Sequence, residues 1–400
     1  MSASASVTKP VRDDEKRMLE DSATAVETTF SECPHYEHAV ASAKGAENEI
    51  PKVLAVVPVY NGKHLVAKAI KSLLSQNYPN LKIVVIDDRS EADLGSLILK
   101  EFSDFPQIKV IRNEENIGLA QTLNKALELV TDEELLLVLQ QDCELLRNDY
   151  VMKAFQHFRY NNDVAMVSGE NSLFEIKELP LMKRVFVHHL CEDLHDESIT
   201  EVGFPLLKAD LFRVEVLRKA GGFESSAKWR LASEDNIISY KIRSLGYKII
   251  KDPSLKFAGH WDGQEGLRQN LKKEAVYGRG LGWALARMKA DLKVGESKQL
   301  KSKKLNRIIQ MQYVFLTVLS GFLFLFSWYI PLVLLSLAAL IQLGYLCHRA
   351  WILDGAKERL VFIATGFLRG WVYIPSFCFG FLRGSALNLK EKITPSSKSR

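Results

Sequence analysis

Residues 135–144 read Leu-Leu-Leu-Val-Leu-Gln-Gln-Asp-Cys-Glu, an apolar run that stops on a short polar and acidic cluster. A continuous apolar run of this length is typical of a strand buried on both faces of a parallel sheet. Such sheets bind ligands beyond the carboxyl ends of their strands, where carboxylates hold divalent cations. The stretch therefore predicts a strand that brings Asp142 to a Mg²⁺ or Mn²⁺ ion bound to phosphates. Glu144, two residues on, shares this task or falls on the other face of the chain. The alternative is a plain turn at the strand end.

Units of strand and helix repeat on either side of this run. The predicted strands are 53–59, 81–86, 108–111 and 248–257, and the predicted helices are 63–75, 94–102, 118–129 and 234–245. Repeated units of this kind predict an open, mostly parallel α/β sheet with helices on both faces. Neither a Gly-x-Gly-x-x-Gly motif nor a Gly-Lys-Ser/Thr loop follows the first strand, which argues against a dinucleotide-binding domain and a P-loop enzyme.

Polar clusters follow two more of these strands. In Pro58-Val59-Tyr60-Asn61, the tyrosine ring is suited to stacking on a nucleobase, although a turn with a capping asparagine is an equally good interpretation. Asp87-Asp88-Arg89-Ser90 offers two carboxylates that can accept from a base N–H and a ribose hydroxyl, or can cap the next helix.

A further acidic pair, Glu234 and Asp235, follows Ser233 at the start of a predicted helix. Carboxylates in the first turn of a helix are favourable partners of the helix dipole. They can also present a general base to the hydroxyl of a sugar acceptor. Both interpretations stay open at this point.

Composition narrows the class of protein. The 400 residues carry a formal net charge of only +5, which argues against a nucleic-acid-binding protein. The five cysteines are scattered without a Cys-x-x-Cys spacing, so we expect no zinc knuckle or disulfide framework, and a reducing compartment. The first 50 residues resemble a disordered tail; Cys33, His35 and His38 lie close together there and form a metal site or a chance grouping.

Residues 308–347 contain no Asp, Glu, Lys, Arg or His. As a helix they would extend about 60 Å, twice the roughly 30 Å hydrocarbon core of a bilayer. We therefore predict a transmembrane helical hairpin with its turn at Ser327-Trp328-Tyr329-Ile330-Pro331; the alternative is a buried soluble hairpin. Basic residues flank both ends, which predicts that both ends lie in the cytoplasm.

A third apolar stretch, 360–382, has Arg369 near its centre and Pro375 further on. Gly-Phe-Leu-Arg-Gly occurs twice, at 366–370 and 380–384, and a basic tail follows. Because a central charge is unfavourable in lipid, we expect a re-entrant or interface-lying pair of helices. A third crossing, packed through its small residues, is the alternative.

Taken together, these residues resemble the family 2 glycosyltransferases of the GT-A fold, in which membrane helices after the catalytic domain are common. The resemblance covers residues 53–250, about half of the chain. It rests on the order of the motifs, which are Val57-Pro58-Val59-Tyr60-Asn61, Asp87-Asp88-Arg89-Ser90, Asn116-Ile117-Gly118-Leu119-Ala120 with Asn124, the cluster at Asp142, Gly221-Gly222-Phe223-Glu224, and Glu234-Asp235.

The resemblance implies a role for each motif. Tyr60 and Asp87 would hold the nucleobase and Asp88 the ribose, and the remaining nucleotide-sugar contacts would come from Pro58, Asn61, Asn116, Gly118 and Gln141. Asp142 would hold the metal on the diphosphate. Asp235 would deprotonate the acceptor hydroxyl, giving single displacement with inversion, and Glu234 would orient it.

Three further residues are implied at the edge of the site. His260 resembles a late histidine that completes the metal shell in some GT-A enzymes, or it is an ordinary loop histidine. Trp229 would stack on an acceptor sugar or simply pack in the core. Arg279 would meet a diphosphate or a lipid phosphate.

One departure from the family pattern concerns the metal strand, where the family usually has Asp-x-Asp and this chain has Gln140-Gln141-Asp142. Loss of one carboxylate weakens metal binding and raises the alternative of an inactive homologue. A processive polysaccharide synthase is disfavoured, because no Gln-x-x-Arg-Trp run follows Glu234-Asp235.

The sequence thus predicts an enzyme of the cell membrane, multi-pass, with its catalytic domain on the cytoplasmic face. It would be an inverting glycosyltransferase of glycan biosynthesis that uses Mg²⁺ or Mn²⁺, a nucleotide-sugar donor, a lipid-linked or glycan acceptor and membrane lipid, without nucleic acid. The alternative is a catalytically inactive nucleotide-binding scaffold in a glycan-assembly pathway. The predicted domains are a tail at 1–50, a GT-A domain at 51–290, a basic linker at 291–307, the membrane hairpin at 308–347 and a third membrane-associated segment with basic tail at 348–400.

Overall fold

The computed structural model describes residues 50–62, 65–172, 179–190, 196–205, 207–225, 233–260, 266–288, 298–325 and 328–393. Cys33, His35, His38 and Trp229 lie outside these ranges, so the predictions made for them stay predictions. All described residues except Arg159–Asn161 fall in one folding unit.

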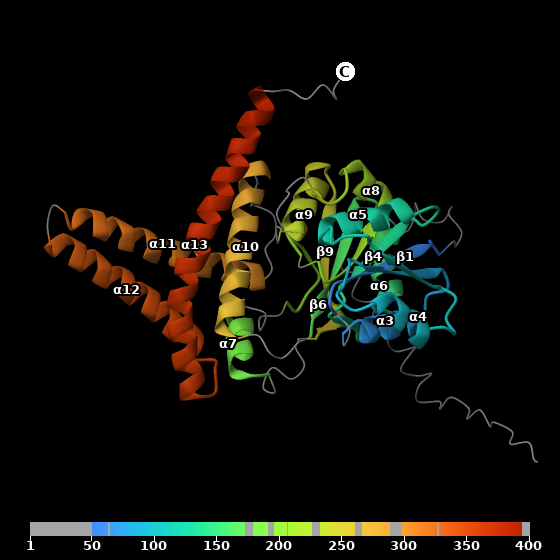
Figure 1. Cartoon of the computed structure of the whole chain (residues 1–400), viewed down its shortest axis with the longest axis horizontal. Helices are drawn as coiled ribbons and strands as arrows, with labels where there is room; N and C mark the ends of the chain where they lie inside the picture. Colours follow the sequence, from blue (N-terminus) through green and yellow to red (C-terminus); the bar gives the residue numbers. More distant parts are fainter. Residues whose placement is uncertain are drawn as a thin grey trace, which may run out of the picture. The chain divides into compact units, whose positions relative to one another are not determined.

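A nine-stranded sheet forms the centre of the first half of this unit (Figure 1), in the order β3-β2-β1-β4-β8-β6-β9-β5, with β7 paired to β9. The strands are β1 (Val53–Val59), β2 (Leu81–Asp87), β3 (Ile108–Arg112), β4 (Leu135–Leu139), β5 (Cys143–Leu145), β6 (Val164–Asn171), β7 (Thr200–Glu201), β8 (Ala209–Arg213) and β9 (Lys248–Gly259). In this described sheet, β5, β7 and β8 run against the other six strands. The prediction of a mostly parallel sheet is therefore confirmed for strand direction, but the sheet is mixed because β8 is inserted antiparallel between β4 and β6.

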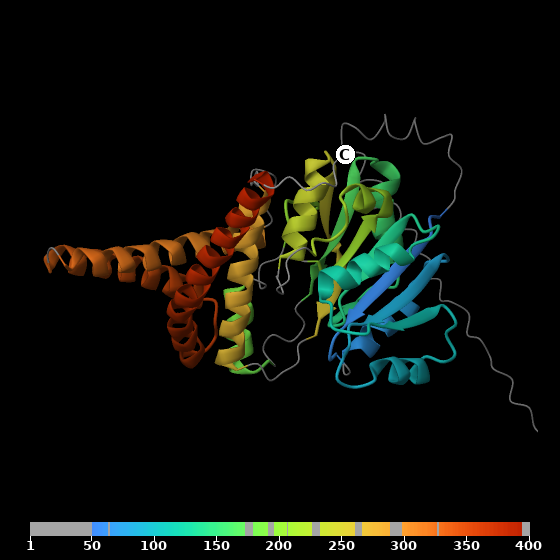
Figure 2. The ribbon, with the colours of Figure 1, turned by 45° about the horizontal axis from the view of Figure 1, so that its top comes forward.

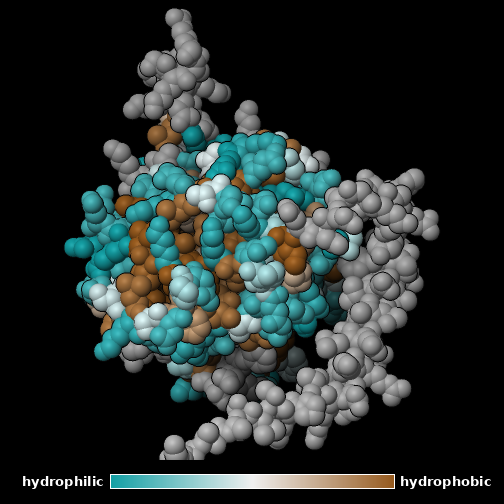
Figure 3. Space-filling model, turned by 90° about the vertical axis from the view of Figure 1, so that its right-hand side faces the viewer, coloured by the Kyte–Doolittle hydropathy of each residue, from teal (hydrophilic) through white to brown (hydrophobic). Residues whose placement is uncertain are grey.

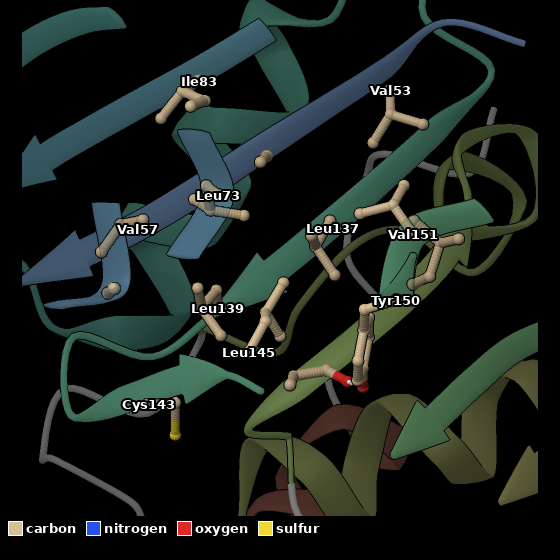
Figure 4. Close-up of a cluster of buried hydrophobic side chains, with 14 of the residues drawn as sticks. Val53, Val57, Leu73, Ile83, Leu137, Leu139, Cys143, Leu145, Tyr150 and Val151 are labelled. Atoms are coloured by element: carbon tan, nitrogen blue, oxygen red, sulfur yellow. Dashed lines mark hydrogen bonds between the residues drawn. The ribbon is translucent and has the colours of Figure 1, made fainter. Parts of the chain in front are cut away.

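Helices cover both faces of the sheet because the strands are apolar on both sides. Val53, Ala55 and Val57 of β1 point to one core cluster, and Leu54 and Val56 point to another. The first cluster, part of which Figure 4 shows, lies under α3 (Val66–Leu74), α4 (Leu94–Glu101) and α6 (Tyr150–Tyr160). The second lies under α5 (Leu119–Leu129), α8 (Val214–Lys219) and α9 (Glu234–Ser244). This arrangement leaves the strand ends as the place where polar side chains gather.

The second half of the unit is helical (Figures 1 and 2) and consists of α7 (Leu181–His189), α10 (Leu267–Met288), α11 (Lys298–Leu323), α12 (Tyr329–Ala350) and α13 (Ala356–Ile393). The predicted hairpin is present as the contacting pair α11 and α12, and Pro331 lies in the first turn of α12. Among the described helices, Tyr329–Ala350 and Ala356–Leu387 are long and apolar enough to cross a membrane, by length and composition only. α11 does not meet that test. The sequence predicts that the helices now seen as α11 and α12 cross the membrane, whereas the two helices that meet the test are α12 and α13.

The prediction of a re-entrant or interface-lying pair of helices in the third apolar stretch is wrong. Residues 360–382 lie inside the single continuous helix α13, with Pro375 in its interior, and do not form a re-entrant pair. A proline is tolerated inside a helix when neighbouring helices hold the backbone in place. Here α13 packs along α10, which provides that support.

The two copies of Gly-Phe-Leu-Arg-Gly in α13 pack on different helices: the first on α11 and α12, the second on α10. A Cβ added to Gly366 would clash with Leu346 of α12, and one added to Gly370 would contact Gln310 of α11. In the second copy, Gly380 lies against the backbone of Arg279 in α10, and Gly384 lies against Trp283. From the other side, Gly278 and Gly282 of α10 meet the backbone of α13 at Tyr373 and Phe377. The two helices therefore approach backbone to backbone, as small-xxx-small sequences allow.

Arg369, the charge inside the third apolar stretch, is buried and paired. Its guanidinium forms an ion pair with Glu274 of α10, which also pairs with Arg307 of α11 at 2.9 Å. Arg369 is 2% exposed and Glu274 is 0% exposed. The unfavourable central charge that the sequence suggests is thus paired with a buried carboxylate, which it shares with Arg307.

Candidate active site

The ends of β1 and β4 are joined by one side chain. The backbone N–H of Tyr60 donates to Oε1 of Gln141 at 2.9 Å, and Nε2 of Gln141 donates to the carbonyl of Tyr60 at 3.1 Å. Gly62 packs so closely on this amide that a Cβ there would clash with it. Gln141 therefore holds the loop after β1, while the ring of Tyr60 stays 40% exposed, as stacking on a nucleobase requires.

Asp87, at the end of β2, is fully buried. Its Oδ1 accepts from the backbone N–H of Ser90 at 2.9 Å and from the Ser90 hydroxyl at 2.5 Å, and its Oδ2 lies 3.3 Å from Arg112. Ser90 in turn accepts from the backbone N–H of Asn61, which has a left-handed φ of 55°. Asp87 thus ties the loop after β2 to the loop after β1, and its role towards a nucleobase stays a prediction.

Asp88 organises a third loop. Its Oδ1 accepts from Asn113 and from the backbone N–H of Ile117, both at 2.9 Å, and its Oδ2 accepts from the backbone N–H of Gly118 at 2.8 Å. Gly118 has a φ of 85°, a conformation that favours glycine. The capping alternative is wrong for both aspartates, since Asp93 caps α4. Asn116, half-buried in the same loop, is thereby brought to the edge that carries Tyr60.

Asp142 follows β4 and meets two partners from distant parts of the chain. Its Oδ2 lies 2.9 Å from Nζ of Lys208, and its carbonyl accepts from the backbone N–H of His260 at 2.6 Å. Burial raises the pKa of Asp142, but the Lys208 ammonium more than offsets this, so the net pKa is lowered and the group is ionised at neutral pH. The carboxylate is 27% exposed on its side chain, so it can be reached from solvent.

Antiparallel pairing of β5 with β9 places His260 beside the predicted metal ligands. Its Nε2 lies 2.6 Å from Glu144, and its Nδ1 lies 3.4 Å from Nζ of Lys68. Because an ammonium only donates, Nδ1 of His260 is the acceptor. Nε2 then carries the proton and donates a hydrogen bond to the Glu144 carboxylate. His260 and Glu144 are thus engaged with each other, next to Asp142.

The side chains at this edge supply only some of the ligands that a divalent cation needs. Among the described residues, no group of three His, Cys, Asp or Glu side chains is close enough to enclose a metal. Magnesium, however, commonly takes one or two carboxylates and completes its shell with water and substrate phosphates. Asp142 fits that mode of binding as the one carboxylate ligand.

A group of acidic side chains lies at the start of α9. Burial raises the pKa of Glu234 to about 7, and the adjacent Asp235 carboxylate adds to the rise. Burial likewise raises the pKa of Asp210 to about 7, to which Asp235 also contributes. Asp210 shares its face of β8 with Phe212, which packs under α8 and α9, so it points towards this group. Hydrogen bonds from Ser168 and from the backbone of Lys208 act in the opposite direction and lower the pKa of Asp210, but burial outweighs them.

The Gly221-Gly222-Phe223 motif is hydrogen-bonded to Asn124. Asn124 of α5 donates to the carbonyl of Phe223 at 2.8 Å and accepts from its backbone N–H at 2.7 Å. Gly221 and Gly222 have φ values of 73° and 68°, which form the turn that brings Phe223 there. Two of the motifs thus interact, and Phe223 is held against α5.

Two predicted site residues lie apart from these contacts. Pro58 is buried within β1, opposite Ile86 of β2. Arg279 is half-buried on α10, where Gly380 of α13 packs on its backbone. Their roles stay predictions.

Lys208 and Asp210 are the polar residues of this edge that the sequence interpretation missed. The available signal was an acidic residue inside an otherwise apolar run, Ala209–Phe212, preceded by a lysine. Their place at the site depends on β8 lying next to β4, which a local pattern does not show.

Replacing Asp210 with asparagine is expected to stabilise the fold more at pH 8 than at pH 5. The pKa of Asp210 is about 7 in the folded chain, against an ordinary value of 3.8. Ionisation of this carboxyl therefore lowers the free energy of unfolding as the pH rises from about 4 to about 7, and the whole loss is present above pH 7. The gain in unfolding free energy should grow by roughly 3 kcal/mol between pH 5 and pH 8.

Thermal unfolding of the detergent-purified chain, followed by tryptophan fluorescence at both pH values, measures this gain. Asp104→Asn, at an exposed position, is the matched control and should change the melting temperature equally at both pH values. An Asp210→Asn gain that is the same at pH 5 and pH 8 would show that the carboxylate titrates normally.

Comparison with known proteins gives a consistent result. The model of the family "Glycosyl transferase family 2" matches residues 54–219. Glycosyltransferase GlyG of Streptococcus pneumoniae serotype 4 (strain ATCC BAA-334 / TIGR4) is 30% identical over 219 residues, 48% of this chain and 71% of GlyG. The "GalNAc(5)-diNAcBac-PP-undecaprenol beta-1,3-glucosyltransferase" of Campylobacter jejuni subsp. jejuni serotype O:2 is 32% identical over 97 residues, 22% of this chain and 31% of that protein.

Coverage limits what these relatives imply, since the chain spans only 20% to 31% of the first three curated relatives that it matches. Among solved structures, mannosyltransferase PcManGT from Pyrobaculum calidifontis, in complex with GDP-Man and Mn²⁺, aligns with a TM-score of 0.50 and 17% identity. The alignment covers 92% of this chain and 99% of that one. At this identity the likeness shows the fold alone, and it confirms the predicted GT-A architecture.

Proposed function

Because the chain belongs to glycosyl transferase family 2, we propose that it transfers a sugar from a nucleotide-sugar to a lipid-linked or glycan acceptor, with inversion at the anomeric carbon. One observation carries the proposal: hydrogen bonds and an ion pair connect the ends of β2, β1, β4 and β8 in a single edge. The connection runs from Asp87 through Ser90 and Asn61 to the Tyr60 loop, and from Gln141 and Asp142 to Lys208.

The proposed reaction is a single displacement. Asp235 accepts the proton of the acceptor hydroxyl, whose oxygen forms a bond to the anomeric carbon as the bond to the diphosphate breaks. Glu234, whose pKa is raised to about 7, orients the base and is partly protonated at neutral pH. Trp229 and Arg279 are proposed contacts of the acceptor. The nucleoside diphosphate is the leaving group.

Tyr60, Asn61, Asp88 and Asn116 are the proposed contacts of the nucleoside. The exposure of the Tyr60 ring supports its role in stacking. The loop held by Asp88 is proposed to contact the nucleoside from another side. Asp142 would hold a Mg²⁺ or Mn²⁺ ion, with His260 and Glu144 beside it, and such an ion supplies positive charge against the diphosphate when bound.

Membrane association is supported by the surface of the helices. Large apolar side chains of the α11–α12 pair are exposed, among them Phe315, Val318, Phe322, Leu332, Leu337 and Leu340. The face of the sheet half in Figure 3 is, by contrast, mainly hydrophilic with smaller apolar patches. Contiguous exposed apolar surface of this kind marks contact with lipid or protein.

We propose that the helical half lies in a cell membrane with the catalytic domain on its cytoplasmic face. The division at 51–290, 291–307, 308–347 and 348–400 is retained in this proposal, although α10, within the first range, packs along α13. The name of the Campylobacter relative states an undecaprenol-linked sugar, which supports a lipid-linked acceptor here.

A nucleotide-binding scaffold is the second candidate function. It is favoured by the neutral Gln140 at the end of β4 and by the pairing of Asp142 with Lys208. A scaffold would bind the donor without releasing nucleoside diphosphate from it, which separates the two candidates.

The test begins with the full chain extracted from membranes in detergent; release by alkaline carbonate alone would exclude the membrane anchor. Thermal unfolding is then followed with UDP-, GDP- and dTDP-sugars, with and without Mn²⁺. A donor at a hundred times its dissociation constant stabilises the fold by about 2.7 kcal/mol, which is readily measured as a higher melting temperature. Nucleoside diphosphate release with a lipid extract as acceptor then distinguishes an enzyme from a scaffold. No stabilisation by any donor would refute the proposal.

A further inference from the structure

The ion pair between Lys208 and Asp142 sets this site apart from a plain carboxylate metal site. Nζ of Lys208 lies 2.9 Å from Oδ2 of Asp142, and the side chains are 34% and 27% exposed. Both groups are therefore accessible from the outer side of the sheet edge. The pair is neutral overall where two carboxylates would carry two negative charges.

The position of Lys208 is fixed by its backbone. The backbone N–H of Gln140 donates to the carbonyl of Lys208 at 2.9 Å, and Nε2 of Gln140 donates to the carbonyl of Leu207 at 3.2 Å. Gln140 thus anchors both residues that precede β8. The side-chain amide at this position therefore holds Leu207, and the backbone N–H of the same residue holds the lysine that follows it.

The remaining groups at this edge strengthen the case for an anion. Gln141 is neutral and has its amide on the Tyr60 backbone. Lys68 of α3 adds a second ammonium near His260. A diphosphate carries clustered negative charge, and lysine binds phosphate well as a point charge. Glu144 is the other carboxylate here, and it is paired with His260. A solvent-accessible ammonium on Asp142 is therefore chemically suited to a diphosphate.

We propose that Lys208 binds the diphosphate of the nucleotide donor and supplies part of the positive charge that a divalent cation otherwise provides. The ammonium is shared between Asp142 and a phosphate oxygen when the donor is bound. Donor binding consequently persists without a divalent cation and is strengthened by one. This inference rests on the proposed function, since it assigns a residue to the donor site.

Isothermal titration calorimetry of the full detergent-purified chain with UDP, GDP and dTDP, in EDTA and in Mn²⁺, tests the assignment. We expect wild-type protein to bind one of these in EDTA. Lys208→Met should weaken that binding by about tenfold to a hundredfold, and Lys208→Arg should retain most of it. Lys109→Met, at an exposed position on β3, is the matched control and should bind as the wild type does.

A second measurement has the opposite sign. Lys208→Met leaves the Asp142 carboxylate without its ammonium, so the variant should bind Mn²⁺ more tightly than wild type in the presence of the same nucleotide. Electron paramagnetic resonance of free Mn²⁺ measures this directly. A misfolded variant would lose both kinds of binding, so the combination of weaker nucleotide binding and tighter Mn²⁺ binding identifies the charge of Lys208 as the cause.

The outcomes separate the two proposals. Nucleotide binding that requires Mn²⁺ and is unchanged in Lys208→Met would overturn the role of Lys208 and leave the proposed function intact. No binding of UDP, GDP or dTDP in either buffer would overturn the proposed function and this inference with it.

Discussion

Changing Asp235 to asparagine is expected to reduce the rate of sugar transfer by about 10²- to 10⁴-fold, the usual contribution of a general base. Oδ1 of Asp235 accepts from the backbone N–H and the side-chain amide of Asn236, both at 2.8 Å, so the carboxylate is held in place at the start of α9. Asparagine keeps this shape but does not accept a proton. Nucleoside diphosphate release from the donor that best stabilises the protein, with a lipid extract as acceptor, measures the rate.

The affinity for the donor should stay nearly unchanged in Asp235→Asn, because the nucleoside contacts lie at β1 and β2. Glu234→Gln should lose less activity, since the raised pKa of Glu234 leaves much of that group protonated at neutral pH. Asp104→Asn should behave as wild type. Transfer at near wild-type rate by Asp235→Asn would remove Asp235 from the role of base.

Replacing Glu274 with glutamine is expected to destabilise the helical half by about 3–5 kcal/mol, the range found when one partner of a buried ion pair is removed. Glu274 is fully buried between Arg369 and Arg307, so the variant would leave the buried guanidinium of Arg369 and the half-buried one of Arg307 without an anion. Arg307 lies 3.5 Å from the ring centroid of Tyr373, and that contact alone is too weak to compensate. Thermal unfolding in detergent measures the loss.

Glu128→Gln, at an exposed position of α5, is the matched control and should melt as wild type does. Replacing Glu274, Arg307 and Arg369 together by leucine, methionine and methionine should recover most of the stability, because buried charge groups exchanged for apolar side chains of similar size are often neutral in their effect. An unchanged melting temperature in Glu274→Gln would show that the three charges are not coupled.

Local patterns predicted the first part of the sheet well. β4 has the predicted bounds Leu135–Leu139, and β2 and β3 end one residue after the predicted ends. These strands are continuous apolar runs between polar clusters, so the signal lies within each segment. The polar ends at Tyr60, Asp88 and Asp142 were predictable for the same reason.

The contacts that depend on distant pairing were not predictable in this way. The direction of β8 is set by its hydrogen bonds to β4 and β6, and those bonds, together with the two from Gln140, bring Lys208 to Asp142. The sequence showed the Gly-Phe-Leu-Arg-Gly repeat but not its partners on α10, α11 and α12. Likewise, Arg369 looked like a charge in lipid because its counter-ion Glu274 lies 95 residues away in the chain.

Both glycine-rich copies in α13 are occupied from within the chain. The first is filled by Leu346 and Gln310, and the second by the backbone of α10. Glycine spacings of this kind often serve to join identical helices of two molecules. In this protein a second copy would have to displace α10, α11 or α12 first, so we expect the glycine face of α13 to contribute nothing to dimerisation, and any homo-oligomer to form through other surfaces.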